Sequence, residues 1–208
     1  ILLFYLPSMR WACKYRNDHA AVVLDTDFSE QVDQFKDVTT IDEAHPNRFF
    51  CPQGQVNELG NVLFGSRIDG IKRILTDPTA FKRETLLTVG ILFYILMTLT
   101  FGVALPSGIF TPSVLIGASL GGAAGITFQD WFGTQVTPST FALLGVAALL
   151  AGIQRSTVSL CVILVEGTGQ IKVLMPSIIV VVIARYVASS IYEKGVFEAV
   201  MEWKHLPY

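Results

Sequence analysis

Residues 85–105 read TLLTVGILFYILMTLTFGVAL, from Thr85 to Leu105. This stretch contains no Asp, Glu, Lys or Arg and consists of apolar or small side chains. At about 1.5 Å per residue, about twenty such residues cross a hydrocarbon core of roughly 30 Å. The stretch therefore predicts one conventional transmembrane helix.

Charge stays scarce after this stretch. Glu84 is followed by no Asp, Glu, Lys or Arg until Asp130, and Asp130 by none until Arg155. Over the whole chain 15% of residues are charged and 51% are hydrophobic, whereas about 25% of residues are charged in an average soluble domain. A helix of a soluble core needs a solvated face, and several helices in succession would lack one here. The sequence thus predicts an all-α, polytopic membrane protein.

The apolar segments after residue 110 are shorter and richer in Gly and Pro. Pro112–Phe128, Phe141–Ile153 and Ser156–Val165 are not expected to cross a membrane alone, and Met175–Ile191 carries Arg185 and is expected to be tilted or partly buried in protein. Tilted and broken helices are tolerated in a membrane where their ends line a cavity. They indicate a transport site.

The polar part of the chain precedes these helices. Helical apolar spacing at Gln55–Phe64 and Arg67–Leu75 predicts two short helices at the membrane surface within a solvent-facing loop. The loop balances acidic against basic residues, so its charge does not orient it across the membrane. We divide the chain into the end of a membrane helix (1–10), the loop (11–83), membrane helices (84–192) and a last helix leading to a cytosolic region (193–208).

The turn Leu105-Pro-Ser-Gly-Ile-Phe-Thr-Pro112 is the candidate binding site. Pro112 fits the first turn of a helix, so the turn precedes a helix start. Gly108 allows close approach, and the amides of Ile109 and Phe110 would lie at the positive end of the helix dipole. Such amides bind an anion without a fixed cation, and weakly enough to release it. The same residues also suit an ordinary turn.

Three motifs, in order along the chain, resemble one family. Gly108-Ile-Phe-Thr-Pro112 is similar to the GxFxP signature of the CLC family of chloride channels and anion/proton exchangers. Cys51-Pro-Gln-Gly-Gln-Val-Asn-Glu-Leu59 resembles a loop motif of its eukaryotic endolysosomal and plant vacuolar members, and Arg155-Ser-Thr-Val-Ser-Leu160 with Glu166 resembles its penultimate-helix pattern. The resemblance covers nearly the whole chain and is weakest in residues 14–48.

The resemblance implies the second of two inverted repeats of the CLC fold, in a homodimer whose subunits each have an anion path. The first half, with the gating and proton-transfer glutamates, is expected to be missing, as is a nucleotide-binding CBS region after Tyr208. The helices at 156–168 and 174–190 would contribute to the dimer interface. An intracellular membrane (endosomal, lysosomal or vacuolar) and an accessory subunit on the 11–83 loop are further expectations.

The implied function is proton-coupled exchange of chloride or nitrate. An uncoupled voltage-gated chloride channel is the alternative within transport, because the deciding glutamates would lie upstream. A non-transporting membrane scaffold derived from the same fold is the alternative from another class.

The family's anion site also uses a tyrosine hydroxyl from the last membrane helix, and Phe197 aligns with that tyrosine. Phenylalanine has no hydroxyl donor, so anion binding is expected to be weaker than usual. Tyr192, five residues earlier, would be the donor in a different register.

Two charges admit both a functional and a structural interpretation. Glu166 is the only acid in its apolar stretch and is a candidate for proton movement, but at a helix end it can also accept backbone hydrogen bonds or pair with Arg155 or Arg185. Arg155 is expected to begin a helix, either as an entrance charge that attracts anions or as a structural cap or interfacial partner.

Other functions find no support in the pattern. The net charge of −2 without a basic run does not indicate nucleic-acid binding. We expect no enzyme, because no nucleophile has a base partner, and no metal site or cofactor. Gly117, Gly121, Gly122 and Gly125 lack a phosphate-loop ending and indicate close helix packing. Whether Cys13 and Cys51 form a disulfide stays open.

Overall fold

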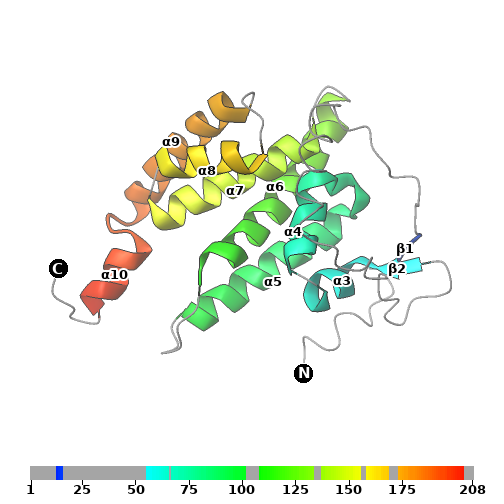
Figure 1. Ribbon diagram of the computed structural model, residues 1–208, viewed down its shortest axis with the longest axis horizontal. Coiled ribbons are helices and arrows are strands. Elements are labelled where there is room, and N and C mark those ends of the chain that lie inside the picture. The colour runs from blue at the N-terminus through cyan, green and yellow to red at the C-terminus, as the bar shows by residue number, and fades with distance from the viewer. Residues whose placement is uncertain are drawn as a thin grey trace.

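The computed structural model describes residues 13–15, 55–65, 67–101, 108–133, 137–155, 158–168 and 173–203 (Figure 1). The expected helix end at 1–10, most of the 11–83 loop with Cys51, and residues 204–208 lie outside these ranges. The disulfide and accessory-subunit predictions therefore fall outside the described residues.

The described chain is helical, which confirms the predicted fold class. One pair of strands was not anticipated: β1 (Cys13–Tyr15) pairs antiparallel with β2 (Gln55–Asn57). The helices are α3 (Glu58–Phe64), α4 (Arg67–Thr76), the 3₁₀ turn η3 (Pro78–Ala80), α5 (Arg83–Phe101), α6 (Phe110–Phe132), α7 (Pro138–Gln154), α8 (Val158–Thr168), α9 (Leu174–Ile191) and α10 (Val196–Trp203).

Within the described ranges, three segments are long and apolar enough to cross a membrane: α5, α6 and a segment beginning with α9 at Leu174. The Gly- and Ala-rich segment is longer than the predicted Pro112–Phe128, which corrects the expectation that it is too short to span: α6 begins at Phe110, ends at Phe132 and has 23 residues, enough by length and composition to cross. α7 with 17 residues and α8 with 11 are shorter, as expected.

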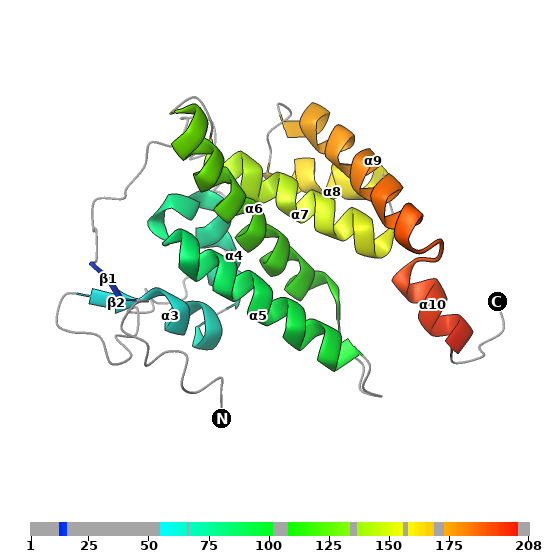
Figure 2. The same cartoon turned by 180° about the vertical axis from the view of Figure 1, so that it is seen from behind.

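α6 lies between α5 and α7 and packs very closely on α7 (Figure 2). A Cβ added to Gly117 would come 2.7 Å from the Cα of Val146, and one added to Gly125 would come 2.8 Å from the Cβ of Phe141. Real Cβ atoms do not approach so closely, so glycine is what allows the contact. This confirms that the glycines of α6 serve helix packing.

α3 and α4 contribute to the same core, although they were expected only at a surface. Leu59 and Ile74 are fully buried, together with Leu86 of α5. Glu58 is 8% exposed, and one of its carboxylate oxygens accepts a hydrogen bond from the Lys82 backbone N–H over 3.1 Å. The bond ties the start of α3 to the start of α5.

The C-terminal end of α6 has the features of a membrane boundary. The Asp130 carboxylate forms an ion pair, over 3.6 Å, with the guanidinium of Arg83, which is the first residue of α5. Both side chains are at least half exposed. Trp131 and Phe132 follow, at 80% and 68% exposed. Charged and aromatic side chains favour the headgroup level of a bilayer. The isolated charge of the apolar stretch thus lies at the end of its helix rather than in the middle.

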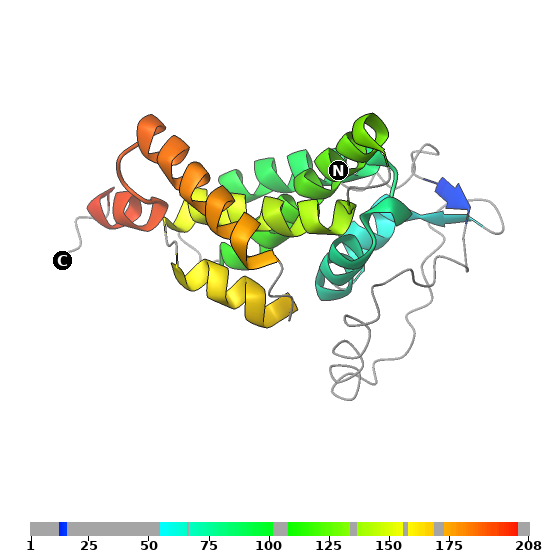
Figure 3. The ribbon, with the colours of Figure 1, turned by 90° about the horizontal axis from the view of Figure 1, so that it is seen from above.

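Figure 3 shows α8, α9 and α10 at the opposite end of the molecule from β1 and β2. α9 packs mainly on α7 and also on α8. Most large apolar side chains of α9 are exposed, including Met175, Ile179 and Ile183.

Candidate anion-binding site

The start of α6 has a defined peptide orientation. Its cap residue is Ile109, with φ −84° and ψ −24°. The Ile109 carbonyl accepts a hydrogen bond from the backbone N–H of Ser113 over 3.1 Å and a second from the Ser113 hydroxyl over 2.7 Å. In a trans peptide the N–H points opposite to the carbonyl. The N–H of Phe110 therefore points out of the helix end, away from the helix body.

The amides at this end have no side-chain cap among the described residues. The Ile109 side chain has no oxygen that could accept a hydrogen bond. The first turn carries no acidic residue, and Pro112 has no N–H. A helix leaves its first amides without intrahelical carbonyls, and these amides carry the positive end of the dipole. The arrangement suits an anion.

The approach to these amides is open on one side. Gly108 is exposed, and a Cβ added to it would meet none of the described atoms within 4 Å. Ile109 is buried at 6% exposed, whereas Phe110 is 45% exposed. The turn thus combines a buried side chain at Ile109 with an exposed residue at Gly108.

Phe197 is the second residue of α10, and its side chain is 51% exposed. α10 packs against α7. Within the described part of the chain, no hydrogen bond or ring contact joins Phe197 to residues 108–110. Its place in the anion site stays a prediction, and so does the alternative register with Tyr192, which caps the end of α9.

Arg155 does not begin a helix, which corrects the expectation from sequence. It is the residue that ends α7, with a left-handed backbone at φ 58° and ψ 10°, and its N–H donates to the Ala151 carbonyl over 3.0 Å. α8 begins only at Val158. The Arg155 guanidinium donates to the Ala188 carbonyl over 3.1 Å and to the Ser189 hydroxyl over 3.2 Å. Arg155 therefore makes the contacts of a structural cap on α9.

Glu166 is exposed in the last turn of α8, at a helix end as expected. Neither Arg155 nor Arg185 forms an ion pair with it within the residues that the structure describes. The helix dipole disfavours a carboxylate at this end. Glu166 keeps both of its interpretations.

Sequence reasoning missed Ser113, which orients the Ile109 carbonyl. Its hydroxyl lies four residues after that carbonyl, the spacing at which a helical serine bonds back to the main chain. That spacing is the signal that could have identified it.

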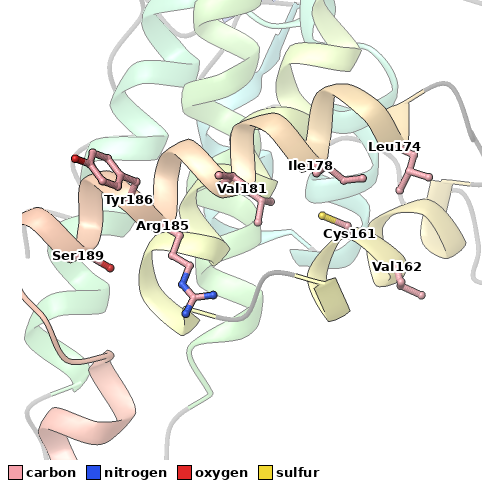
Figure 4. Close-up of a pocket in the computed structure, with 9 residues that line it drawn as sticks. Cys161, Val162, Leu174, Ile178, Val181, Arg185, Tyr186 and Ser189 are labelled. Carbon is pink, nitrogen blue, oxygen red and sulfur yellow. The ribbon is translucent and has the colours of Figure 1, made fainter.

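A groove of about 570 Å³ lies between α8 and α9 (Figure 4). Its lining is mostly apolar and includes Cys161 and Val181, with Arg185, Tyr186 and Ser189 as polar side chains from α9. In Figure 4 these α9 residues follow one another along the helix, and residues 108–110 are not among those that line the groove. The groove is separate from the candidate anion site.

Comparison with known proteins gives concordant results. Residues 46–189 match the family model for voltage-gated chloride channels. Chloride channel protein CLC-b of Arabidopsis thaliana is 35% identical over 77% of this chain and 20% of its own length. Chloride channel protein C of Dictyostelium discoideum is 31% identical over 98% of this chain and 25% of its own, and H(+)/Cl(-) exchange transporter 7 of Mus musculus is 29% identical over 79% and 21%.

The fold matches as well. The crystal structure of a eukaryotic CLC transporter aligns with a TM-score of 0.60 and 30% identity over 100% of this chain and 36% of that one. The chain spans a quarter or less of the curated relatives above. The family model covers most of the chain, and the fold agrees. This chain belongs to the CLC family of voltage-gated chloride channels.

Proposed function

We propose that the chain is the C-terminal half of the membrane domain of a proton-coupled anion exchanger that moves chloride or nitrate. The anion is held by the backbone amides of Ile109 and Phe110. One observation carries this proposal: Ser113 fixes the Ile109 carbonyl inside α6, so that the Phe110 N–H points out of an uncapped helix end beside Gly108.

The backbone amides would bind the anion, but weakly enough for it to dissociate. Two N–H groups and the helix dipole stabilise a monovalent anion by partial charges, whereas a fixed Lys or Arg would hold it more tightly. The first turn of α6 contains neither. This fits a site through which ions pass rather than one in which they remain.

Proton coupling is supported by the name of one relative, an H(+)/Cl(-) exchange transporter. An uncoupled chloride channel is the second candidate, favoured by the names of the plant relatives, which are chloride channel proteins. One feature favours a non-transporting scaffold: Phe197 stands where the family's anion site has a tyrosine hydroxyl donor.

The proposed assembly is a homodimer in an intracellular membrane. The exposed apolar side chains of α8 and α9, such as Val162, Ile178 and Val182, would be covered by a second copy and by lipid. No resident cofactor is proposed for this half; chloride, nitrate and protons are substrates.

The test is chloride efflux from liposomes that contain the full-length protein, with internal pH followed at the same time. A chloride gradient that drives protons uphill at a fixed ratio supports the exchanger. Chloride efflux without proton movement replaces it with the channel. No efflux of chloride or nitrate from correctly folded protein supports the scaffold and contradicts both transport proposals.

A further inference from the structure

The junction between α9 and α10 is held by a single side chain from another helix. Both terminal nitrogens of Arg155 are engaged: one donates to the Ser189 hydroxyl and the Glu193 carbonyl, the other to the Ala188 and Tyr192 carbonyls. Four acceptors use the four hydrogens of these two nitrogens. The guanidinium thus bridges the end of α7 to the last turn of α9 and the turn that follows.

The backbone of Arg155 is suited to this bridge. Its φ of 58° is the only positive φ of a non-glycine residue in the described chain. Glycine is the usual residue at such a helix end, because a Cβ is disfavoured there. Arginine bears that penalty, and its side chain is thereby directed from the end of α7 to the carbonyls at the end of α9. Carbonyls at a helix C-terminus carry the negative end of the dipole, which favours a cation there. The Ala188 carbonyl accepts the Tyr192 N–H over 3.0 Å and the Arg155 guanidinium as a second donor.

The bridge continues into the first turn of α10. Gly195 is buried, and a Cβ added to it would have Arg155 Cγ as its nearest neighbour, at 3.4 Å. The Gly195 N–H donates to the Glu198 carboxylate over 3.2 Å, and its carbonyl accepts from the Ala199 N–H over 2.9 Å. The Glu198 contact is the acidic half of a capping box, and the Ala199 contact is the first backbone bond of α10. Phe197 lies two residues after Gly195, inside this capped turn.

We propose that Arg155 is a positioning residue for anion transport, because its guanidinium sets where α10, and with it Phe197, lies relative to the start of α6. This rests on the proposed function, and it replaces the idea of Arg155 as an entrance charge. Both terminal nitrogens of Arg155 donate to protein oxygens, so the guanidinium is held at the α9–α10 junction and makes the contacts of a positioning residue.

The experiment is a double-mutant cycle in the full-length protein reconstituted in liposomes. Arg155→Gln and Phe197→Tyr are made singly and together, and the chloride concentration that gives half-maximal efflux is measured for each. Arg185→Gln is the matched control, since it removes a positive charge from α9, and among the described residues the Arg185 side chain makes no hydrogen bond or ion pair. Arg155→Lys keeps the charge but loses the fork that reaches several oxygens at once.

We expect Arg155→Gln to change the effect of Phe197→Tyr on half-maximal chloride by at least about twofold, the coupling typical of interacting positions. Arg155→Lys should behave like Arg155→Gln, and Arg185→Gln should leave the effect of Phe197→Tyr unchanged.

Two results overturn the proposal. If the effects of Arg155→Gln and Phe197→Tyr multiply independently in folded protein, Arg155 stabilises the fold without positioning α10. If Arg155→Lys restores wild-type behaviour and the loss in Arg155→Gln disappears at high salt, Arg155 acts as an entrance charge. Absence of anion transport in the wild-type protein would instead reject the proposed function, so the two failures are distinguishable. Should Arg155→Gln not fold, Ser189→Ala, which removes one acceptor, takes its place in the cycle with the same criteria.

Discussion

Gly121 of α6 and Gly145 of α7 lie backbone against backbone. A Cβ added to Gly145 would come 2.7 Å from the Cα of Gly121, and one added to Gly121 would come 2.9 Å from the Cα of Gly145. Both contacts are with main-chain atoms, which cannot rotate away as a side chain does. The spacing of α6 and α7 therefore depends on these two positions, and α6 carries the candidate anion site.

Gly145→Ala is expected to push the two helices apart and to lower the free energy of unfolding by about 1–3 kcal/mol, the usual range for overpacking. Gly152→Ala is the matched control, because Gly152 lies in the same helix and an added Cβ there meets none of the described atoms within 4 Å. Thermal unfolding of the full-length protein in detergent should show a lower midpoint for Gly145→Ala alone. Equal midpoints would contradict the close contact.

Gly108→Val tests access to the amides. The branched side chain would occupy the open space beside the start of α6, and we expect chloride efflux to fall by about tenfold, equivalent to roughly 1.4 kcal/mol, without loss of thermal stability. Thr111→Val, a shape-conserving change that removes a hydroxyl but keeps the amide, should leave efflux unaltered. The reverse pattern would move the anion from the backbone to the Thr111 side chain.

Phe197→Tyr should add a hydroxyl donor to the anion and tighten chloride binding by about tenfold, since a hydrogen bond to a charged group contributes about 1.5–3 kcal/mol. Isothermal titration calorimetry of the full-length protein measures this change. Tyr192→Phe is the control for register: it should have no effect. A loss of affinity in Tyr192→Phe with no gain in Phe197→Tyr would assign the site to Tyr192.

Glu58→Ala should destabilise the protein by about 1–3 kcal/mol, because it removes a buried carboxylate and, with it, the part-buried hydrogen bond from the Lys82 backbone N–H. Glu58→Gln retains an acceptor of the same length and should cost less. Chemical unfolding of the full-length protein compares the two variants. Equal losses for Gln and Ala would show that the carboxylate charge, rather than the hydrogen bond, is what matters at this position.

Much of this fold is readable from the sequence, because lipid permits few solutions for an uncharged stretch. The absence of charge between Glu84 and Asp130 predicts membrane helices. Gly108 and Pro112 locate the start of α6 within two residues. α6 extends past the predicted segment through Gln129 and Asp130, where the apolar pattern ends. Polar residues at a membrane boundary can remain helical, since the helix satisfies its own backbone.

The misplacement of Arg155 has a different cause. The sequence on both sides of Arg155 is typical of helices and does not indicate a left-handed residue. Tertiary contacts of the Arg155 side chain with Ser189 and the Ala188 carbonyl stabilise this conformation. Those acceptors lie more than thirty positions later in the chain. Local pattern carries no information on such a contact.

The central claim is that the anion sits at the start of α6, and replacing chloride by bromide in a crystal of the full-length protein tests it most directly. We predict an anomalous bromide peak within hydrogen-bonding distance of the Ile109 and Phe110 amide nitrogens, weaker in the Gly108→Val variant. Bromide bound elsewhere in the membrane domain, with no peak at these amides, would contradict the account.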